Sequence, residues 1–312
     1  MKLPNGTVSG EVNPSEIPQL SVIVASAHSA RDVEMFLDSL SSQVSGRKVE
    51  IIVVDSSQDD DLETVIAKHP EAIFQRFAAT ASLPELWAFG IGRSKGEIVA
   101  IMDSTCPPDE RWVDAVVEAH RSPQPVIGGA VELDGRPSVI DLAAYFCEYA
   151  QFMRPLAEGA ATELPGNNLS VKRWVLAKGQ EYVKDRFWKT QWCRKLQDDG
   201  VVLISAPSIV VRYRRSFRLL PFTVRRFHHG RCFAGMRVAR ASTLIRGLYA
   251  IGSTMLPAVF TFRVIRTVAS KRRYLGKFLL SFPISLAAIV SWSIGELFGY
   301  LGGPGGSCAH VR

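Results

Sequence analysis

Two aspartates stand at the ends of two predicted strands, where their carboxylates could bind a substrate. Five apolar residues, Ile98 to Met102, indicate a strand buried on both faces, and Asp103 ends it. Asp55 ends a second predicted strand over 49–54. Because ligands of open parallel sheets bind beyond the carboxyl ends of the strands, we expect both carboxylates to project into one crevice. The alternative for Asp103 is a turn-forming role only.

The elements that must position these aspartates alternate along the chain. Apolar strands are predicted at 20–25, 49–54, 72–77, 98–102 and 125–131, and helices at 31–42, 83–93 and 109–121. This alternation predicts a doubly wound, mostly parallel, Rossmann-like α/β sheet. The sequence contains no G-x-G-x-x-G after the first strand, no P-loop and no nucleophile elbow, which disfavours dinucleotide oxidoreductases, P-loop enzymes and serine hydrolases.

A polar turn at 165–170 supplies further candidate ligands. Gly166, Asn167 and Asn168 come just before a helix predicted over 171–178. The two amides can donate to sugar hydroxyls or phosphate oxygens, or they can form a turn with a helix cap, and the sequence leaves both roles open. The triple acid at 59–61 is better explained as a helix start than as a metal site.

Charge divides the chain into two halves. Residues 1–200 hold 20 Lys/Arg and 29 Asp/Glu, whereas residues 201–312 hold 17 Lys/Arg and one acid, Glu296. The acidic half argues against nucleic acid as a partner, and the basic, apolar half favours the anionic cytoplasmic face of a membrane. Five scattered cysteines without C-x-x-C spacing predict a reducing compartment and no disulfide scaffold.

The basic half contains two apolar segments. The first, 247–262, is short for a bilayer and has basic residues on both sides, so we expect it to be re-entrant or interfacial. The second, 278–302, is long enough to span, and Glu296 within it should be paired or lie near the interface. The predicted organisation is a flexible tail (1–18), an α/β domain (19–215), a basic amphipathic interfacial segment (216–246), membrane helices (247–302) and a tail (303–312).

The order and spacing of these elements resemble those of a known family. The segments that carry the resemblance are 20–24, 50–57, 96–103 and 165–173. Residues 19–240 resemble the inverting nucleotide-sugar glycosyltransferases of the GT-A fold, a family of polysaccharide- and cell-wall-assembly enzymes. Residues 230–234, with the pairs 295–296 and 299–300, resemble the tail of its membrane-associated bacterial branch.

The resemblance implies roles for particular residues. It implies a nucleotide-sugar donor bound by Ala25, Ser26, Asp55, Asp103 and Ser104. It assigns acceptor binding to Gly166, Asn167 and Asn168, and membrane or phosphate contacts to Arg226, Arg231 and Arg237. It also implies a divalent cation, Mg²⁺ or Mn²⁺, at Asp103, and a cytoplasmic catalytic domain at the cell inner membrane, with a lipid-linked or glycan acceptor and possible partner proteins of polysaccharide assembly.

Three positions depart from the family pattern. The acidic triplet D-x-D reads Asp103-Ser104-Thr105, and Thr is a poor lone ligand for these cations. The position of the acid before the amphipathic helix aligns with Lys189, so Asp185 and Glu181 are the candidate catalytic carboxylates. The histidine after the late strand is replaced by Arg212 or Tyr213. The alternative function is therefore a catalytically impaired relative that binds a nucleotide-sugar or a partner in polysaccharide assembly.

Overall fold

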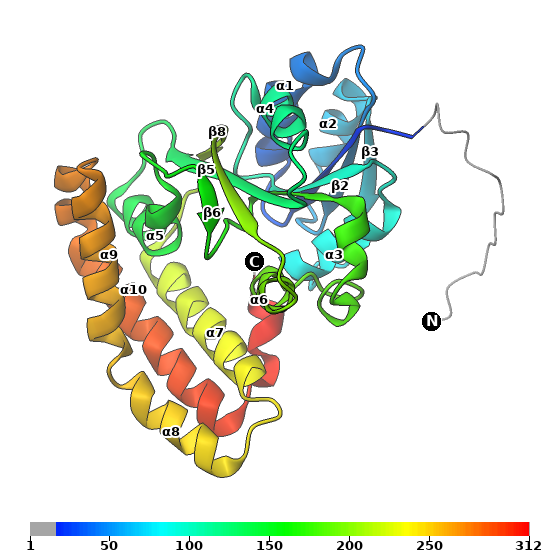
Figure 1. The fold of residues 1–312 in the computed structure, drawn as a ribbon. Helices are drawn as coiled ribbons and strands as arrows, with labels where there is room; N and C mark the ends of the chain where they lie inside the picture. Colours follow the sequence, from blue (N-terminus) through cyan, green and yellow to red (C-terminus); the bar gives the residue numbers. More distant parts are fainter. Residues whose placement is uncertain (1–16, 312) are drawn as a thin grey trace.

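The computed structural model describes residues 17–311, so most of the predicted tail at 1–18 lies outside the described residues. An eight-stranded sheet, in the order β3-β2-β1-β4-β7-β5-β8-β6, forms the frame of the molecule (Figure 1). Its strands are β1 (Leu20–Ser26), β2 (Val49–Asp55), β3 (Ala72–Arg76), β4 (Ile98–Asp103), β5 (Val126–Leu133), β6 (Gly159–Ala161), β7 (Asn168–Lys172) and β8 (Leu203–Tyr213).

Helices cover the sheet and then form a layer of their own. The helices of the α/β part are α1 (Ala30–Val44), α2 (Leu62–Lys68), α3 (Leu83–Arg93), α4 (Trp112–Ala119), α5 (Val139–Tyr149) and α6 (Lys189–Asp198). Those of the basic half are α7 (Leu219–Arg237), α8 (Thr243–Ser253), α9 (Leu256–Lys271) and α10 (Leu275–Gly302). Short 3₁₀ turns are η2 (Ala150–Phe152), η3 (Arg173–Ala177), η4 (Gln180–Tyr182) and η5 (Gly305–His310). Figure 1 shows α7 to α10 gathered on one side, away from β1, β2 and β3.

The central strands confirm the predicted parallel core. β1 lies between β2 and β4 and is parallel to both. Every residue of β1 and β4 is buried, because helices cover both faces of the sheet there. The register places Ser26 opposite Asp55 and Ala25 opposite Asp103, so the two aspartates end their strands at the same edge.

The second half of the sheet differs from the prediction. The segment predicted as a helix at 171–178 forms β7 and η3 instead, and β7 runs antiparallel between β4 and β5. Residues 203–213 form one strand, β8, which is parallel to β5. β-Branched and apolar residues suit either a short helix or a buried strand, and pairing with β4 decides between them.

Glycines bring α7 and α10 into backbone contact. A Cβ on Gly295 would lie 2.1 Å from the Phe227 carbonyl oxygen, and one on Gly230 would lie 2.2 Å from that of Trp292. No side chain fits at these distances, so the two helices pack as closely as their backbones permit. Glu296 lies in this interface, 2% exposed, and pairs with Arg237 at 3.2 Å, as expected for a carboxylate inside an apolar segment.

The helical layer exposes a broad apolar surface. By length and composition α10 is a candidate membrane span, and α8 with α9 form a second candidate if this pair, bent by 55°, counts as one span. Large exposed apolar side chains on these helices are Leu244, Leu248, Ile251, Met255, Val259, Phe262, Leu279, Leu280, Ile294 and Phe298. Exposed apolar side chains in this number are typical of a protein that contacts a membrane or another protein.

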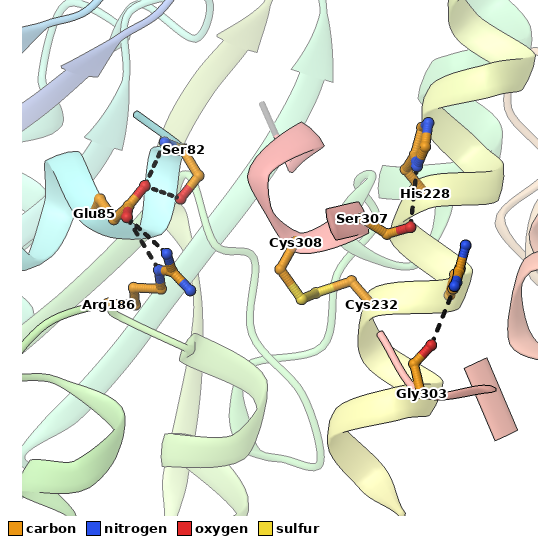
Figure 2. The surroundings of a disulfide bond; sticks show 9 residues. Ser82, Glu85, Arg186, His228, Cys232, Gly303, Ser307 and Cys308 are labelled. Carbon is orange, nitrogen blue, oxygen red and sulfur yellow. Dashed lines mark hydrogen bonds and ion pairs between the residues drawn. A yellow bond between two sulfur atoms is a disulfide. The ribbon is translucent and has the colours of Figure 1, made fainter. Parts of the chain in front are cut away.

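The segment after α10 turns back toward the α/β domain. A disulfide joins Cys232 of α7 to Cys308 of η5, and Figure 2 shows it beside the Ser307–His228 hydrogen bond. The sequence analysis did not predict this pair, because the two cysteines are 76 residues apart and their spacing carries no signal. The carbonyl oxygen of Val311 then accepts a hydrogen bond from the amide of Leu83, at the start of α3.

Candidate functional site

A cavity of about 470 Å³ lies between the α/β domain and the helical layer. It is lined by Asp103 of β4, by Leu83 and Trp87 of α3, and by residues of α9 and α10. Glu163, Gly166 and Asn167 line it from the segment before β7, and residues that line it from the basic half include Arg215, Arg225, Arg226, His229, Arg237 and Arg263.

Asp103 has both of the roles that the sequence left open. Its Oδ1 accepts hydrogen bonds from the amide (2.9 Å) and the hydroxyl (2.8 Å) of Thr105, which is the expected turn. Its side chain nevertheless lines the cavity. The indole of Trp87 donates to the carbonyl oxygen of Met102 at 2.7 Å and so fixes the α3 wall against the end of β4.

Asp55 does not share this cavity, which corrects the expectation of a common crevice. It is 1% exposed, and its Oδ2 accepts hydrogen bonds from the amide and the hydroxyl of Ser57. Because successive residues of a strand alternate between the faces, the register that pairs Asp55 with Ser26 and Asp103 with Ala25 places the two carboxylates on opposite faces of the sheet. The two carboxylates share an edge but not a cleft.

The edge itself carries polar atoms whose hydrogen-bonding capacity is unused. Within residues 17–311, the side-chain oxygens Ser26 Oγ, Asp55 Oδ1, Ser56 Oγ and Ser104 Oγ are buried and have no hydrogen-bond partner. Ser26 and Asp55 end β1 and β2, whereas Ser56 and Ser104 follow β2 and β4. The amide of Ser104 donates to the carbonyl of Ala25. Buried polar groups without partners are costly, so their gathering at one edge indicates a place where a ligand supplies the missing bonds.

The adjacent amides Asn167 and Asn168 have different surroundings. Asn168 accepts from the indole of Trp112 (3.0 Å) and donates to the carbonyls of Ala130 (2.9 Å) and Ile209 (3.0 Å), and it is 1% exposed. It therefore joins α4, β5 and β8 and cannot reach an acceptor, contrary to the prediction. Asn167 lines the cavity, and its Oδ1 has no partner in the described part of the chain.

The two carboxylates predicted to be catalytic lie outside the cavity. Glu181 and Asp185 are both exposed, and neither is a lining residue. Lys189, which aligns with the family's acid, does line the cavity. Its Nζ donates to the carbonyl oxygen of Leu164 at 2.6 Å. The sequence analysis did not identify Glu163, which lies 3.7 Å from Lys189 Nζ and does line the cavity.

Of the three arginines assigned to membrane or phosphate contacts, two line the cavity and one does not. Arg226 and Arg237 line the cavity. Arg226 stacks 4.3 Å from the centre of the Trp292 ring. Arg231 is not a lining residue, and its Nε donates to the carbonyl oxygen of Gly303, so it holds the C-terminal segment.

The residues at Asp103 do not fit the cation site of a D-x-D motif. The second carboxylate is replaced by Thr105, whose hydroxyl already donates to Asp103. Among residues 17–311 no group of three or more His, Cys, Asp or Glu side chains is placed to hold a metal ion. Asp32 interacts electrostatically with Asp103, but its Oδ2 accepts from Ser29 Oγ at the start of α1. Mg²⁺ and Mn²⁺ favour several carboxylate or carbonyl oxygens, and this set offers too few.

Comparison with known families identifies the domain that carries this edge. Residues 21–155 match the model of glycosyl transferase family 2. This segment is a family 2 glycosyltransferase domain. The match covers β1 to η2, including the ends of β1, β2 and β4, and makes the chain an enzyme of the glycosyltransferase class.

A solved structure shares the fold. It is described as mannosyltransferase PcManGT from Pyrobaculum calidifontis in complex with GDP-Man and Mn²⁺. The two chains have 17% sequence identity and a TM-score of 0.56, and the similarity covers 94% of this chain and 91% of that one. The likeness therefore includes the helical layer and confirms the GT-A fold. The search of curated proteins finds no match.

Proposed function

We propose that this glycosyltransferase moves a sugar from a nucleotide-diphosphate donor to a lipid-linked acceptor, with inversion, at the cytoplasmic face of a bacterial inner membrane. The observation that carries the proposal is the cavity, which runs from Asp103 at the sheet edge to the apolar helices α9 and α10. A water-soluble donor and a lipid-anchored acceptor would meet in it from opposite ends.

The donor end is supported by the family 2 domain and by the sheet edge. Beyond the cavity, along the same edge of the sheet, Ser26, Asp55, Ser56 and Ser104 have unpartnered oxygens. Nucleoside hydroxyls and base edges offer the groups to bond them. GDP-mannose is the donor bound by the structural neighbour, so GDP-sugars and UDP-sugars are the donors to compare. That neighbour also binds Mn²⁺, which supports divalent-cation use by the fold in general.

The acceptor end is supported by arginines beside apolar side chains. Arg226 and Arg263 line the cavity together with Phe260 and Val264 of α9 and Ile289 of α10. Guanidinium groups suit the phosphates of a lipid-linked saccharide, and the apolar wall suits its hydrocarbon. The exposed apolar surface of α8 to α10 would hold this end of the cavity at the membrane.

Glu163 is the proposed general base. Four carboxylates line the cavity: Asp103 accepts from Thr105, Glu148 pairs with Arg225 at 2.6 Å, and Glu296 pairs with Arg237 at 3.2 Å. Glu163 accepts one hydrogen bond from Gln151 Nε2 at 3.2 Å, and its ion-pair distances to Lys189 and Arg263 are both 3.7 Å. It is 41% exposed, so it can take up a proton from an acceptor hydroxyl. Asn167, four residues later, would orient the sugar.

The test measures donor binding and transfer side by side with the full chain in detergent. Wild type should bind GDP-mannose or UDP-glucose and transfer the sugar to an isoprenyl diphosphate-linked monosaccharide, with an inverted product by NMR. Glu163→Gln should lower kcat by about 10²- to 10⁴-fold and leave donor affinity unchanged. Glu181→Gln, outside the cavity, is the matched control. Tight donor binding by wild type without any transfer would identify a catalytically impaired relative instead.

A further inference from the structure

We propose that the guanidinium of Arg215, and not a divalent cation, neutralises the diphosphate that leaves during glycosyl transfer. The inference rests on the proposed function, because it assigns the charge that stabilises the leaving group in that same site. It follows from three observations: the altered acidic motif, the place of Arg215 beside that motif, and the absence of a carboxylate partner for Arg215 in the described part of the chain.

The acidic motif holds one carboxylate where a cation site needs more. Thr105 donates to Asp103 through both its amide and its hydroxyl, at 2.9 and 2.8 Å. The motif therefore forms a hydrogen-bonded turn, and the hydroxyl that replaces the second carboxylate donates to Asp103. A glycosyl transfer still needs positive charge at the departing diphosphate, so another group must provide it.

Backbone pairing places Arg215 beside the motif. The amide of Arg212 donates to the carbonyl of Pro107, and the amide of Arg214 donates to the carbonyl of Thr105, both at 2.9 Å. The end of β8 and the residues after it thus run antiparallel to residues 105–107. The next residue along the chain, Arg215, is set alongside Ser104. Asp103 and Arg215 line the same cavity.

The guanidinium of Arg215 is fixed and remains charged. It forms a hydrogen bond with His28 Nε2 and lies 4.9 Å from the centre of the Phe217 ring. The backbone amide of Phe217 donates to Asp141 Oδ1 at 2.7 Å, which holds that residue in place. Burial acts to lower the pKa of Arg215, the nearby Asp103 carboxylate acts to raise it, and the net pKa is raised. The group is therefore a permanent cation held in one orientation.

Arg215 has no carboxylate within ion-pair distance in the described part of the chain, whereas the nearby Arg225 does. Arg225 lies 4.6 Å from the same Phe217 ring, but it is paired with Glu148 at 2.6 Å. Within residues 17–311, Arg215 forms no ion pair of 4.0 Å or less with a carboxylate. Its charge is thus free to meet a phosphate, for which the planar guanidinium is well suited.

The charge balance of the transfer step agrees with this role. The acceptor oxygen forms a bond to the anomeric carbon as the bond from that carbon to the β-phosphate oxygen breaks. The electron pair of the broken bond stays on the nucleoside diphosphate, where Arg215 stabilises the added negative charge. The proton of the acceptor hydroxyl passes to Glu163.

The experiment compares nucleotide binding and transfer with and without metal. Calorimetry with GDP, UDP, GDP-mannose and UDP-glucose is run on the full chain in EDTA and again in Mn²⁺ or Mg²⁺. We expect wild type to bind and transfer equally in both conditions, and Arg215→Gln to weaken diphosphate binding and lower kcat by about 10²-fold. Arg214→Gln is the matched control, because that exposed side chain pairs with Asp134 at 2.6 Å and does not line the cavity.

A second variant keeps the inference falsifiable if Arg215→Gln alone loses all activity. In the double variant Arg215→Gln/Thr105→Asp we expect nucleotide binding to return only in Mn²⁺, because the second carboxylate completes a cation site. Wild type that binds and transfers only with a metal would overturn the inference while the proposed function stands. Wild type that binds none of the four nucleotides in either condition would overturn the proposed function and the inference with it.

Discussion

Asn167 and Asn168 show how neighbouring identical side chains divide between ligand and scaffold. Their sequence context predicts equal roles, and only the antiparallel pairing of β7 with β4 decides which amide faces the cavity and which faces the α4 side. Asn168 is the first residue of β7, whereas Asn167 lies in the turn before it. The alternation of side chains along a strand separates Asp55 from Asp103. The strand ends were therefore predictable from the sequence, but the cavity lining was not.

The first prediction concerns these two amides. Asn168→Ala should lower the free energy of unfolding by about 2–4 kcal/mol, because it leaves the Trp112 indole and two carbonyls in the core without partners. Asn167→Ala should lower the rate of transfer and change stability by less than about 1 kcal/mol. Chemical denaturation and the transfer assay on both variants test this. Equal stability losses would contradict the division of roles.

His120 should make stability depend on pH. It is 6% exposed, and burial, followed by the charge of Lys172, lowers its pKa from 6.5 to about 4, whereas its hydrogen bond to Ser170 acts against the shift. The unfolded chain therefore takes up this proton first as the pH falls, and stability is lost between pH 6.5 and 4. The contribution lost between pH 7 and pH 5 is about 2 kcal/mol.

The variant His120→Gln isolates this contribution. Between pH 7 and pH 5, the free energy of unfolding should decrease by about 2 kcal/mol less in the variant than in wild type. An identical pH dependence in the two proteins would show that His120 is not buried in its neutral form.

At the scale of elements, the sequence predicts the parallel half of the sheet better than the antiparallel half. β1, β2 and β4 are continuous apolar runs with helices between them, so local pattern and final fold agree. β7 is five residues long and is fixed by its pairing with β4 and β5, which are distant in sequence. The Cys232–Cys308 pair is a long-range contact of the same kind.

The contact of α7 with α10 gives a prediction at this scale. Gly295→Ala should destabilise the helical layer by about 1–3 kcal/mol, since the added methyl group would overlap the Phe227 carbonyl oxygen. Gly302→Ala on the same helix is the control, because a Cβ there meets nothing within 4 Å. Thermal unfolding in detergent compares the two variants. Equal melting temperatures would mean that the two helices do not pack through Gly295.

The whole molecule combines an acidic α/β domain with a basic, apolar helical layer, and this division predicts where the molecule meets a bilayer. The exposed fractions of Leu244, Leu248 and Ile251 on α8 are 75%, 61% and 71%. A protein that leaves such side chains in water would lose several kcal/mol relative to one that buries them in lipid. We therefore expect α8 to lie at the membrane.

Vesicle flotation tests this expectation. Leu248→Glu should reduce binding of the full chain to vesicles of phosphatidylglycerol and phosphatidylethanolamine by about 10-fold or more. Ile73→Glu is the matched control, because Ile73 is 58% exposed on β3, at the opposite edge of the molecule, and should leave binding unchanged (Figure 1). Equal binding by the two variants would remove α8 from the contact surface.

The hydrogen bond from the Leu83 amide to the Val311 carbonyl has a practical consequence for handling the enzyme. Val311 also lines the cavity, so whatever is joined behind this residue begins beside the cavity. A purification tag or fluorescent reporter is therefore better fused ahead of β1.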